Sequence, residues 1–320
     1  MATVTQTPGA TGSDGTVGTS EPGTEQKASR LRRGPRRRRA PLTTGRAIVV
    51  GALVIVFGLT TWCLLYGLAL TPFQESRRQV VLYNDLREQL ALQTAPLGGQ
   101  IVPGTPVALI TAPSIGMADV VVVEGTASGD LMAGPGHRRD TVLPGQTGVS
   151  VLYGRSALFG GPLAGVTNAR PGDSIQVTTG QGVFTYVVDR LRRAGDPLPP
   201  TLAAGAGRLT LATAEGSGRL GDWAPSAVVY LDATLKGQAQ PYPPGRPLAV
   251  PQAERAMQGD PSALLPLALA LPLLLIAVLA SLWAWARWGA WQTWLVGAPL
   301  CLAALWTVSQ AAVQLLPNML

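Results

Sequence analysis

The central part of this 320-residue chain, residues 74–258, contains few side chains that could carry out covalent chemistry. The two cysteines, Cys63 and Cys301, lie in long apolar stretches outside it, so a cysteine nucleophile is excluded there. The hydroxyls of Ser156 and Thr213 remain as candidates. A hydroxyl depends on a neighbouring base much more than a thiol does, because it is less acidic.

The sequence offers no base close to these hydroxyls. The one histidine, His137, follows a Gly-Pro-Gly turn, and this position indicates a structural or surface role. The two lysines are Lys27, far upstream, and Lys236, beyond the last expected strand. One histidine with scattered carboxylates also predicts no metal site and no cofactor.

Three stretches without Asp, Glu, Lys or Arg cover residues 47–70, 262–285 and 292–315. About 20 such residues in a helix cross a bilayer, so each stretch predicts a transmembrane helix. The first is too long for a cleaved signal peptide and indicates a signal anchor. Tryptophans cluster around Trp288–Trp291, which suits a hairpin tip in the headgroup region on the cytoplasmic side.

Residues 1–45 are rich in Thr, Gly, Ser and Pro, a composition that predicts a disordered tail. Nine basic and three acidic residues through Arg46 give +6 of the net charge of +7. A basic run can bind nucleic acid, but here it directly precedes an apolar span. The positive-inside rule therefore explains it more simply, with the N-terminus in the cytoplasm and no nucleic-acid partner.

Between the spans the expected elements change along the chain. Residues 74–93 have leucines every four positions and predict a stalk helix, which packs on the following domain or contacts a partner. Residues 104–235 alternate short apolar runs with Gly and Pro, which predicts a closed β-barrel or a sandwich. Residues 237–261 are rich in Pro and Gly and predict a linker back to the membrane.

The order of several short motifs over residues 104–235 resembles the sortases, cysteine transpeptidases of Gram-positive surfaces, and especially the class E sortases of actinobacteria. The motifs are Ala112-Pro113-Ser114-Ile115-Gly116-Met117, Val122-Val123-Glu124-Gly125, Gly134-Pro135-Gly136-His137, Thr141-Val142-Leu143-Pro144-Gly145-Gln146-Thr147-Gly148, Pro171-Gly172-Asp173 and the strand Leu209–Ala214. The resemblance implies a mainly β fold, a sortase-like closed barrel, held by three transmembrane helices. Arg and Ala usage with few Lys also fits a GC-rich actinobacterial genome.

The resemblance also implies a site built from a cysteine, a histidine and an arginine. Ala214 stands at the position of the family cysteine and Arg155 at that of the histidine, while Arg219 is the nearest candidate for the arginine. An arginine stays protonated and cannot act as a general base, but it can hold a carbonyl or carboxylate oxygen. We therefore expect no catalytic residues and a binding groove that includes Arg155, Ser156, Thr213 and Arg219.

Three functions follow as hypotheses. The first is an extracytoplasmic pseudo-sortase, anchored in the cell membrane, that binds a sorting-signal-like peptide, a cell-wall component or a partner protein. The second is an active transpeptidase or hydrolase with an unrecognised nucleophile, such as Ser156 or Thr213. The third is a structural membrane partner that acts through the C-terminal helical hairpin.

Overall fold

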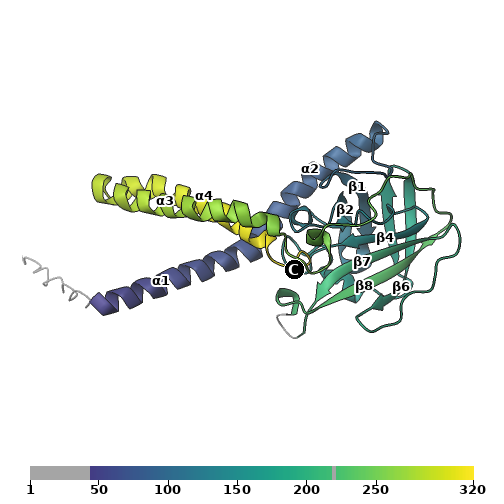
Figure 1. Ribbon diagram of the computed structural model, residues 1–320, viewed down its shortest axis with the longest axis horizontal. Helices are drawn as coiled ribbons and strands as arrows, with labels where there is room; N and C mark the ends of the chain where they lie inside the picture. Colours follow the sequence, from purple (N-terminus) through teal and green to yellow (C-terminus); the bar gives the residue numbers. More distant parts are fainter. Residues whose placement is uncertain (1–43, 218–220) are drawn as a thin grey trace, which may run out of the picture. The chain divides into compact units, whose positions relative to one another are not determined.

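The computed structural model describes residues 44–217 and 221–320, and its central part is a closed β-barrel (Figure 1). The order of the strands around the barrel is β1-β2-β3-β4-β7-β8-β6-β5, and β5 pairs with β1 to close it. The bounds are β1 Pro106–Ala112, β2 Met117–Glu124, β3 Gly136–His137, β4 Gly148–Tyr153, β5 Ser174–Thr179, β6 Gly182–Arg192, β7 Gly207–Glu215 and β8 Ala227–Lys236. The predicted barrel is thus confirmed.

The core lies inside the barrel because alternate residues of each strand point inward. On β7, Leu209 and Leu211 belong to the interior cluster, whereas Ala212 and Ala214 belong to a second cluster on the opposite face. Almost every residue of β7 is buried, since both of its faces are covered. The alternation of apolar residues in the sequence predicted β7 but not β3. Strand β3 has two residues, which are too few to show an alternating pattern.

Two of the motifs meet at β3. Val123 and Glu124 of β2 pair in parallel with Gly136 and His137, and a Cβ on Gly136 would lie 2.1 Å from the Gly125 carbonyl oxygen. His137 is buried with both ring nitrogens engaged: Nδ1 lies 2.8 Å from Glu124 Oε2, and Nε2 lies 2.9 Å from the Val142 carbonyl oxygen. The histidine therefore has a structural role here.

The connection between β2 and β3 is a compact loop around the half-buried Asp130. The Asp130 carboxylate accepts a hydrogen bond of 3.3 Å from the Ala127 amide, and the short helix Asp130–Met132 follows. Burial raises the pKa of this carboxyl from 3.8 to about 6. The loop matters below because Thr126, Ser128 and Leu131 contact the candidate site.

A continuous helical stretch precedes the barrel: α1 Thr44–Leu65, a π-helical segment Tyr66–Leu70 and α2 Thr71–Ala91. Nearly all of the predicted tail over residues 1–45 lies outside the described residues. Helix α2 packs on the barrel through Gln79, whose carboxamide accepts a hydrogen bond from the Val121 amide and donates one to the Val121 carbonyl. This side chain thereby pairs with β2 as a neighbouring strand would.

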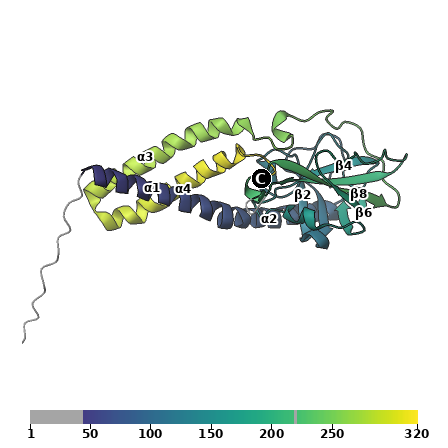
Figure 2. The same ribbon diagram turned by 90° about the horizontal axis from the view of Figure 1, so that it is seen from below.

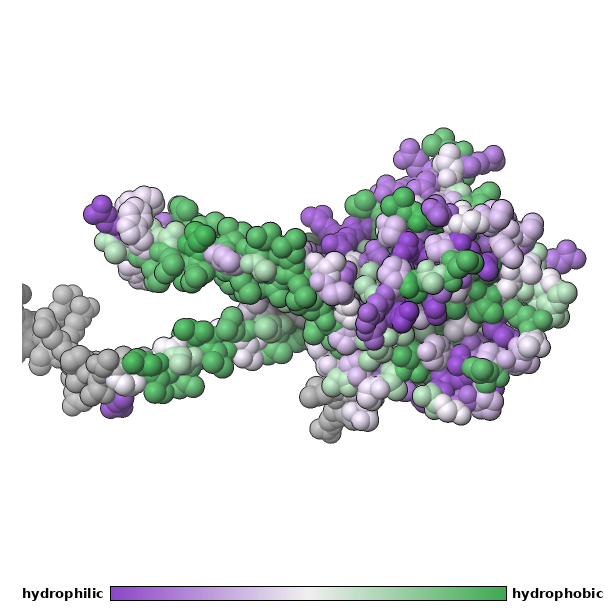
Figure 3. Space-filling model, in the orientation of Figure 1, coloured by the Kyte–Doolittle hydropathy of each residue, from purple (hydrophilic) through white to green (hydrophobic). Residues whose placement is uncertain are grey.

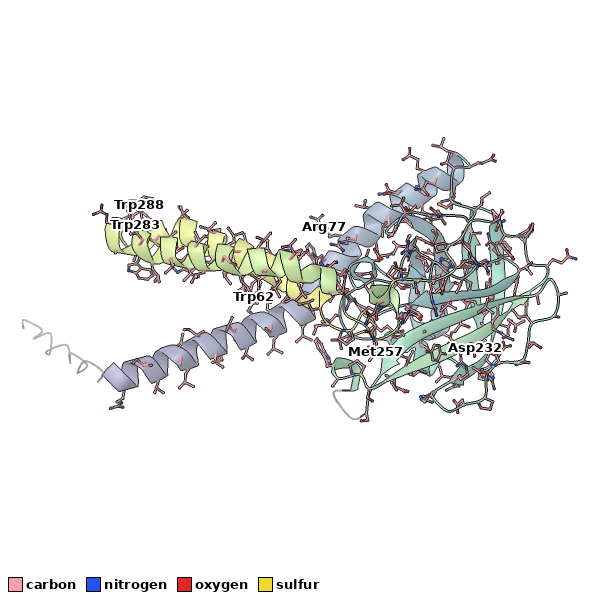
Figure 4. The ribbon with its side chains drawn as sticks, in the orientation of Figure 1. Trp62, Arg77, Asp232, Met257, Trp283 and Trp288 are labelled. Atoms are coloured by element: carbon pink, nitrogen blue, oxygen red, sulfur yellow. The ribbon has the colours of Figure 1, made fainter. Side chains whose placement is uncertain are left out.

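After the barrel, residues 237–260 run along its surface to α3 Leu264–Trp288 and α4 Ala290–Gln314 (Figures 1 and 2). The two helices form a hairpin, with Ser281 close to Gly297, and apolar residues cover them (Figure 3). The rings of Trp283 and Trp288 form an edge-to-face pair near the end of α3 (Figure 4). By length and composition, the helices within 48–91, 261–288 and 290–314 could each cross a membrane.

The first prediction concerns the pair Glu124–His137. Replacement of His137 by alanine leaves the Glu124 carboxylate buried without its partner, which typically costs about 3–5 kcal/mol. We expect the free energy of unfolding of His137→Ala to fall by about this amount in denaturant titrations. Replacement of Arg170, an exposed residue of the barrel, by alanine is the control and should change little. Equal stabilities of the two variants would contradict the structural role of His137.

The second prediction concerns pH. The folded state raises the pKa of Asp130 to about 6, so its carboxyl holds a proton at pH 5 that the unfolded chain releases. The contribution of Asp130 to stability is therefore complete below about pH 4 and is lost as the pH rises through about 6. Asp130→Asn should lose less stability than the unaltered chain between pH 4 and 7. Parallel stability curves for the two proteins would show that this carboxyl does not titrate as expected.

Candidate functional site

The candidate site lies where β4 and β7 end side by side. The two strands run parallel, Tyr153 pairs with Ala212, and the Gly154 amide donates a hydrogen bond of 3.1 Å to the Ala212 carbonyl. Two residues further along each strand direction stand Arg155, beyond Tyr153, and Ala214, beyond Ala212. The topology therefore brings the two positions singled out in the sequence to one edge of the barrel.

Ala214 is buried, with only 3% of its surface exposed. It belongs to an apolar cluster on the outer face of the barrel together with Leu131, Tyr153, Ala212 and Met319. Met257 packs against this cluster and is labelled in Figure 4. The end of β7 thus presents a methyl group in apolar surroundings.

Arg155 is fully buried and its guanidinium is surrounded by oxygens. Nη2 donates to the Ser128 carbonyl at 2.9 Å and to Ser128 Oγ at 2.8 Å, and Nε donates to the Leu131 carbonyl at 3.3 Å. Nη1 donates to the main-chain oxygen of Leu320 at 3.2 Å, and the group lies 5.1 Å from the centre of the Phe159 ring. Burial lowers its pKa to about 9, so at pH 7 it still carries its proton and cannot act as a base.

The segment that follows α4, residues 315–320, fills the space beside Arg155 and Ala214; we call it the tail segment. The Met319 carbonyl oxygen accepts hydrogen bonds from the Ser156 amide at 2.9 Å and from Ser156 Oγ at 3.2 Å. Asn318 and Met319 have no exposed surface. In Figures 1 and 2 the end of the sequence lies against the barrel rather than away from it.

The walls around the tail segment come from three parts of the chain, and together they form what we call the groove. One wall is the ends of β4 and β7, the second is the β2–β3 connection, and the third is residues 252–258. The last two are joined, because Thr126 Oγ1 donates to the Glu254 carbonyl at 2.7 Å and the Glu254 carboxylate pairs with Arg139. The stretch expected to be a linker therefore includes one wall of the groove.

The hydroxyls considered as nucleophiles are both engaged with carbonyl oxygens. Thr213 Oγ1 donates to the Gly154 carbonyl at 3.0 Å, and Ser156 Oγ donates to Met319. His137 is held by Glu124 and Val142, so it does not serve either hydroxyl. Arg219 lies outside the described residues, and its place as the third site residue stays a prediction. Among residues 44–217 and 221–320, Arg155 and Ser156 supply the groove with donors for carbonyl oxygens.

Sequence reasoning missed the tail segment as a part of the site. It assigned residues 292–315 to a transmembrane helix and gave the last five residues no role. The available signal was local: Leu316-Pro317-Asn318 breaks the apolar run after α4, because Pro ends a helix and Asn favours a turn. Nothing in that signal indicates that the segment returns to the barrel.

Comparison with known proteins supports the assignment of the domain. Residues 110–217 match the model of the sortase domain family, and this range contains both Arg155 and Ala214. No curated protein matches the chain.

Three solved structures illustrate the similarity. Sortase E from Streptomyces avermitilis is 27% identical, with 48% of this chain and 100% of that chain covered and a TM-score of 0.36. The Clostridium perfringens sortase D5 transpeptidase is 20% identical, with 50% and 99% covered and a TM-score of 0.40. Clostridium perfringens sortase C with the C-terminal cell wall sorting motif is 18% identical, with 50% and 89% covered and a TM-score of 0.37.

The family match runs from β1 to the end of β7 and agrees with the order of motifs found in the sequence. Residues 110–217 of this chain are a sortase domain.

Proposed function

We propose that this chain is a pseudo-sortase: a membrane protein whose sortase domain lies on the extracytoplasmic face and holds a peptide segment without cutting it. The observation that carries the proposal is the groove itself. Its donors, Arg155 and Ser156, bind main-chain oxygens of the tail segment, while Ala214 offers only a methyl group beside them. Such a groove binds peptide backbone and lacks an atom that could attack it.

Transpeptidation by a cysteine needs a thiolate and a partner that controls its protonation. If Ala214 and Arg155 occupy the positions of the family cysteine and histidine, both requirements fail together. The active alternative would use Thr213 or Ser156. It is disfavoured because Thr213 Oγ1 and Ser156 Oγ each already donate a hydrogen bond to a main-chain carbonyl oxygen.

The helical hairpin has a place in the same proposal. Its outer surface is apolar and suits lipid (Figure 3), and α4 ends at Gln314, immediately before the tail segment. Trp62 Nε1 donates to Ser309 Oγ at 2.9 Å, and the rings of Tyr66 and Trp306 lie 5.6 Å apart, so α1 and α4 pack together near the barrel. The hairpin thus anchors the domain and delivers the tail segment to the groove. A separate molecule that takes the place of the tail segment in the groove would be a peptide, a cell-wall component or a protein partner.

The third prediction concerns chemistry in the full chain, purified in detergent micelles. The unaltered protein should form no acyl adduct and cleave no sorting-signal peptide, as measured by mass spectrometry. Ala214→Cys alone should remain poor, and Arg155→His added to it should raise turnover by on the order of 10²-fold, the usual worth of a general base.

The control for that experiment replaces Thr213 and Ser156 together by alanine. Turnover by the unaltered chain above this control would refute the pseudo-sortase proposal in favour of a hydroxyl nucleophile. Because Arg155→His also removes donors from Ser128 and Leu131, thermal melting must first show that the double variant is folded.

The fourth prediction concerns topology. In a background in which Cys63 and Cys301 are alanine, single cysteines replace Arg170 on the barrel and Gln292 at the start of α4; both are exposed. The positive-inside rule places the N-terminal arginines in the cytoplasm. A membrane-impermeant maleimide should therefore label Arg170→Cys in intact cells and Gln292→Cys only after permeabilisation. The reverse pattern would place the barrel in the cytoplasm and contradict the proposed role.

A further inference from the structure

The groove binds the tail segment through its main chain at three consecutive residues. The Asn318 amide donates to the Gln258 carbonyl at 2.9 Å, the Met319 carbonyl accepts from Ser156, and the Leu320 oxygen accepts from Arg155. Residues 317–320 form a turn, which the hydrogen bond of 3.1 Å from the Leu320 amide to the Pro317 carbonyl closes. The bonds to the groove would form with any peptide that adopts this turn. They give the groove affinity for peptide backbone, and selectivity has to come from side chains.

The surroundings of the Asn318 side chain favour a hydrogen-bond donor. Its Nδ2 donates to the Thr126 carbonyl at 2.7 Å and to the Arg255 carbonyl at 3.0 Å. Because both neighbours are carbonyl oxygens, only an NH₂ group can face them, and the orientation of the carboxamide is settled. An aspartate, equal in shape, would lose both bonds and set a negative charge against two acceptors.

The next side chain, Met319, enters the apolar cluster around the end of β7. Leu131 and Tyr153 contribute the larger surfaces of this cluster, and Ala212 and Ala214 contribute only methyl groups. Small side chains at these two positions leave room for a long, unbranched residue. The groove therefore has one polar and one apolar subsite, at consecutive peptide positions.

Only a short connection joins α4 to the part of the tail segment that the groove binds. Helix α4 ends at Gln314, and Asn318 is bound four residues later. A chain of four residues spans at most about 14 Å, so a fixed α4 keeps the segment near the groove at a high effective concentration.

We propose that the tail segment is a tethered ligand of the groove, and that the groove selects a peptide turn in which a carboxamide side chain is followed directly by an unbranched apolar one. The inference rests on the proposed function, since it takes the groove to be a peptide-binding site. A free peptide of this kind binds only after it displaces the tail segment, so the unaltered chain has a closed groove.

The test measures binding of a dye-labelled peptide with the sequence of residues 315–320 to the full chain in detergent micelles, by fluorescence anisotropy. The Asn318→Asp chain, whose own tail segment is weakened, should bind this peptide at least about 10-fold more tightly than the unaltered chain, because a larger fraction of its grooves is empty. Leu316→Ala is the matched control: Leu316 lies in the same segment, is 40% exposed and should leave the affinity unchanged. Equal affinities of the unaltered and Asn318→Asp chains would overturn the tethered ligand.

Selectivity is tested with altered peptides on the Asn318→Asp chain. A peptide with Asp in place of Asn318 should bind about 100-fold more weakly, because two buried acceptors lose their donors. A peptide with Ala in place of Leu316 should bind within about 3-fold of the unaltered one, as expected for a half-exposed contact. Equal binding of the Asn and Asp peptides would overturn the selectivity.

Two further measurements keep the outcomes distinct. If Asn318→Asp does not fold, a chain that stops after Gln314 provides the empty groove, and hydrogen exchange in the unaltered chain should show a Ser156 amide protected by Met319. A rapidly exchanging Ser156 amide would also contradict the tethered ligand. Mass spectrometry of the same mixtures reports cleavage: selective binding with cleavage would refute only the proposed function, whereas unselective binding without cleavage would refute only this inference.

Discussion

A buried guanidinium requires an oxygen for each of its N–H groups, because an unpaired charge inside a protein costs several kcal/mol. Arg155 makes four such hydrogen bonds, and their acceptors come from parts of the chain that are far apart in sequence. Ser128 and Leu131 come from the β2–β3 connection, and Leu320 comes from the tail segment after the last helix. The need to satisfy one cation therefore holds the groove and its occupant in place.

The residues that stabilise the barrel differ from those, such as Arg155, that form the groove. The barrel depends on interior leucines and valines and on the buried pair Glu124–His137, and none of these residues takes part in the groove. A change at the end of β4 or β7 can therefore alter what the groove does without unfolding the barrel. In the proposed function, an arginine and an alanine at these positions produce a site that binds carbonyl oxygens and has nothing with which to attack them.

The fold could be predicted from the sequence because its signals are local and repeated. Alternation located strands such as β7, and uncharged runs located the long helices, which the structure shows at α1, α3 and α4. The groove was only half predictable. The order of motifs pointed to Ala214 and Arg155, but Asn318 and Gln258 join the site through tertiary contacts that no periodicity records. Short or irregular segments are held by tertiary contacts, and the sequence pattern does not show which residues make those contacts.

The π-helical segment Tyr66–Leu70 changes the direction in which the side chains of α2 face relative to those of α1. A π-helical turn contains more residues than an α-helical one, so this segment rotates everything after it by roughly a quarter turn relative to an uninterrupted α-helix. On one side Tyr66 packs against Trp306 of α4, and on the other Gln79 pairs with β2. Loss of one residue from this segment would favour a regular α-helix and turn Gln79 away from the barrel, which thermal melting would register. The rotation of α2 about its own axis relative to α1, as much as the length of the helical stretch, therefore decides whether Gln79 faces the barrel.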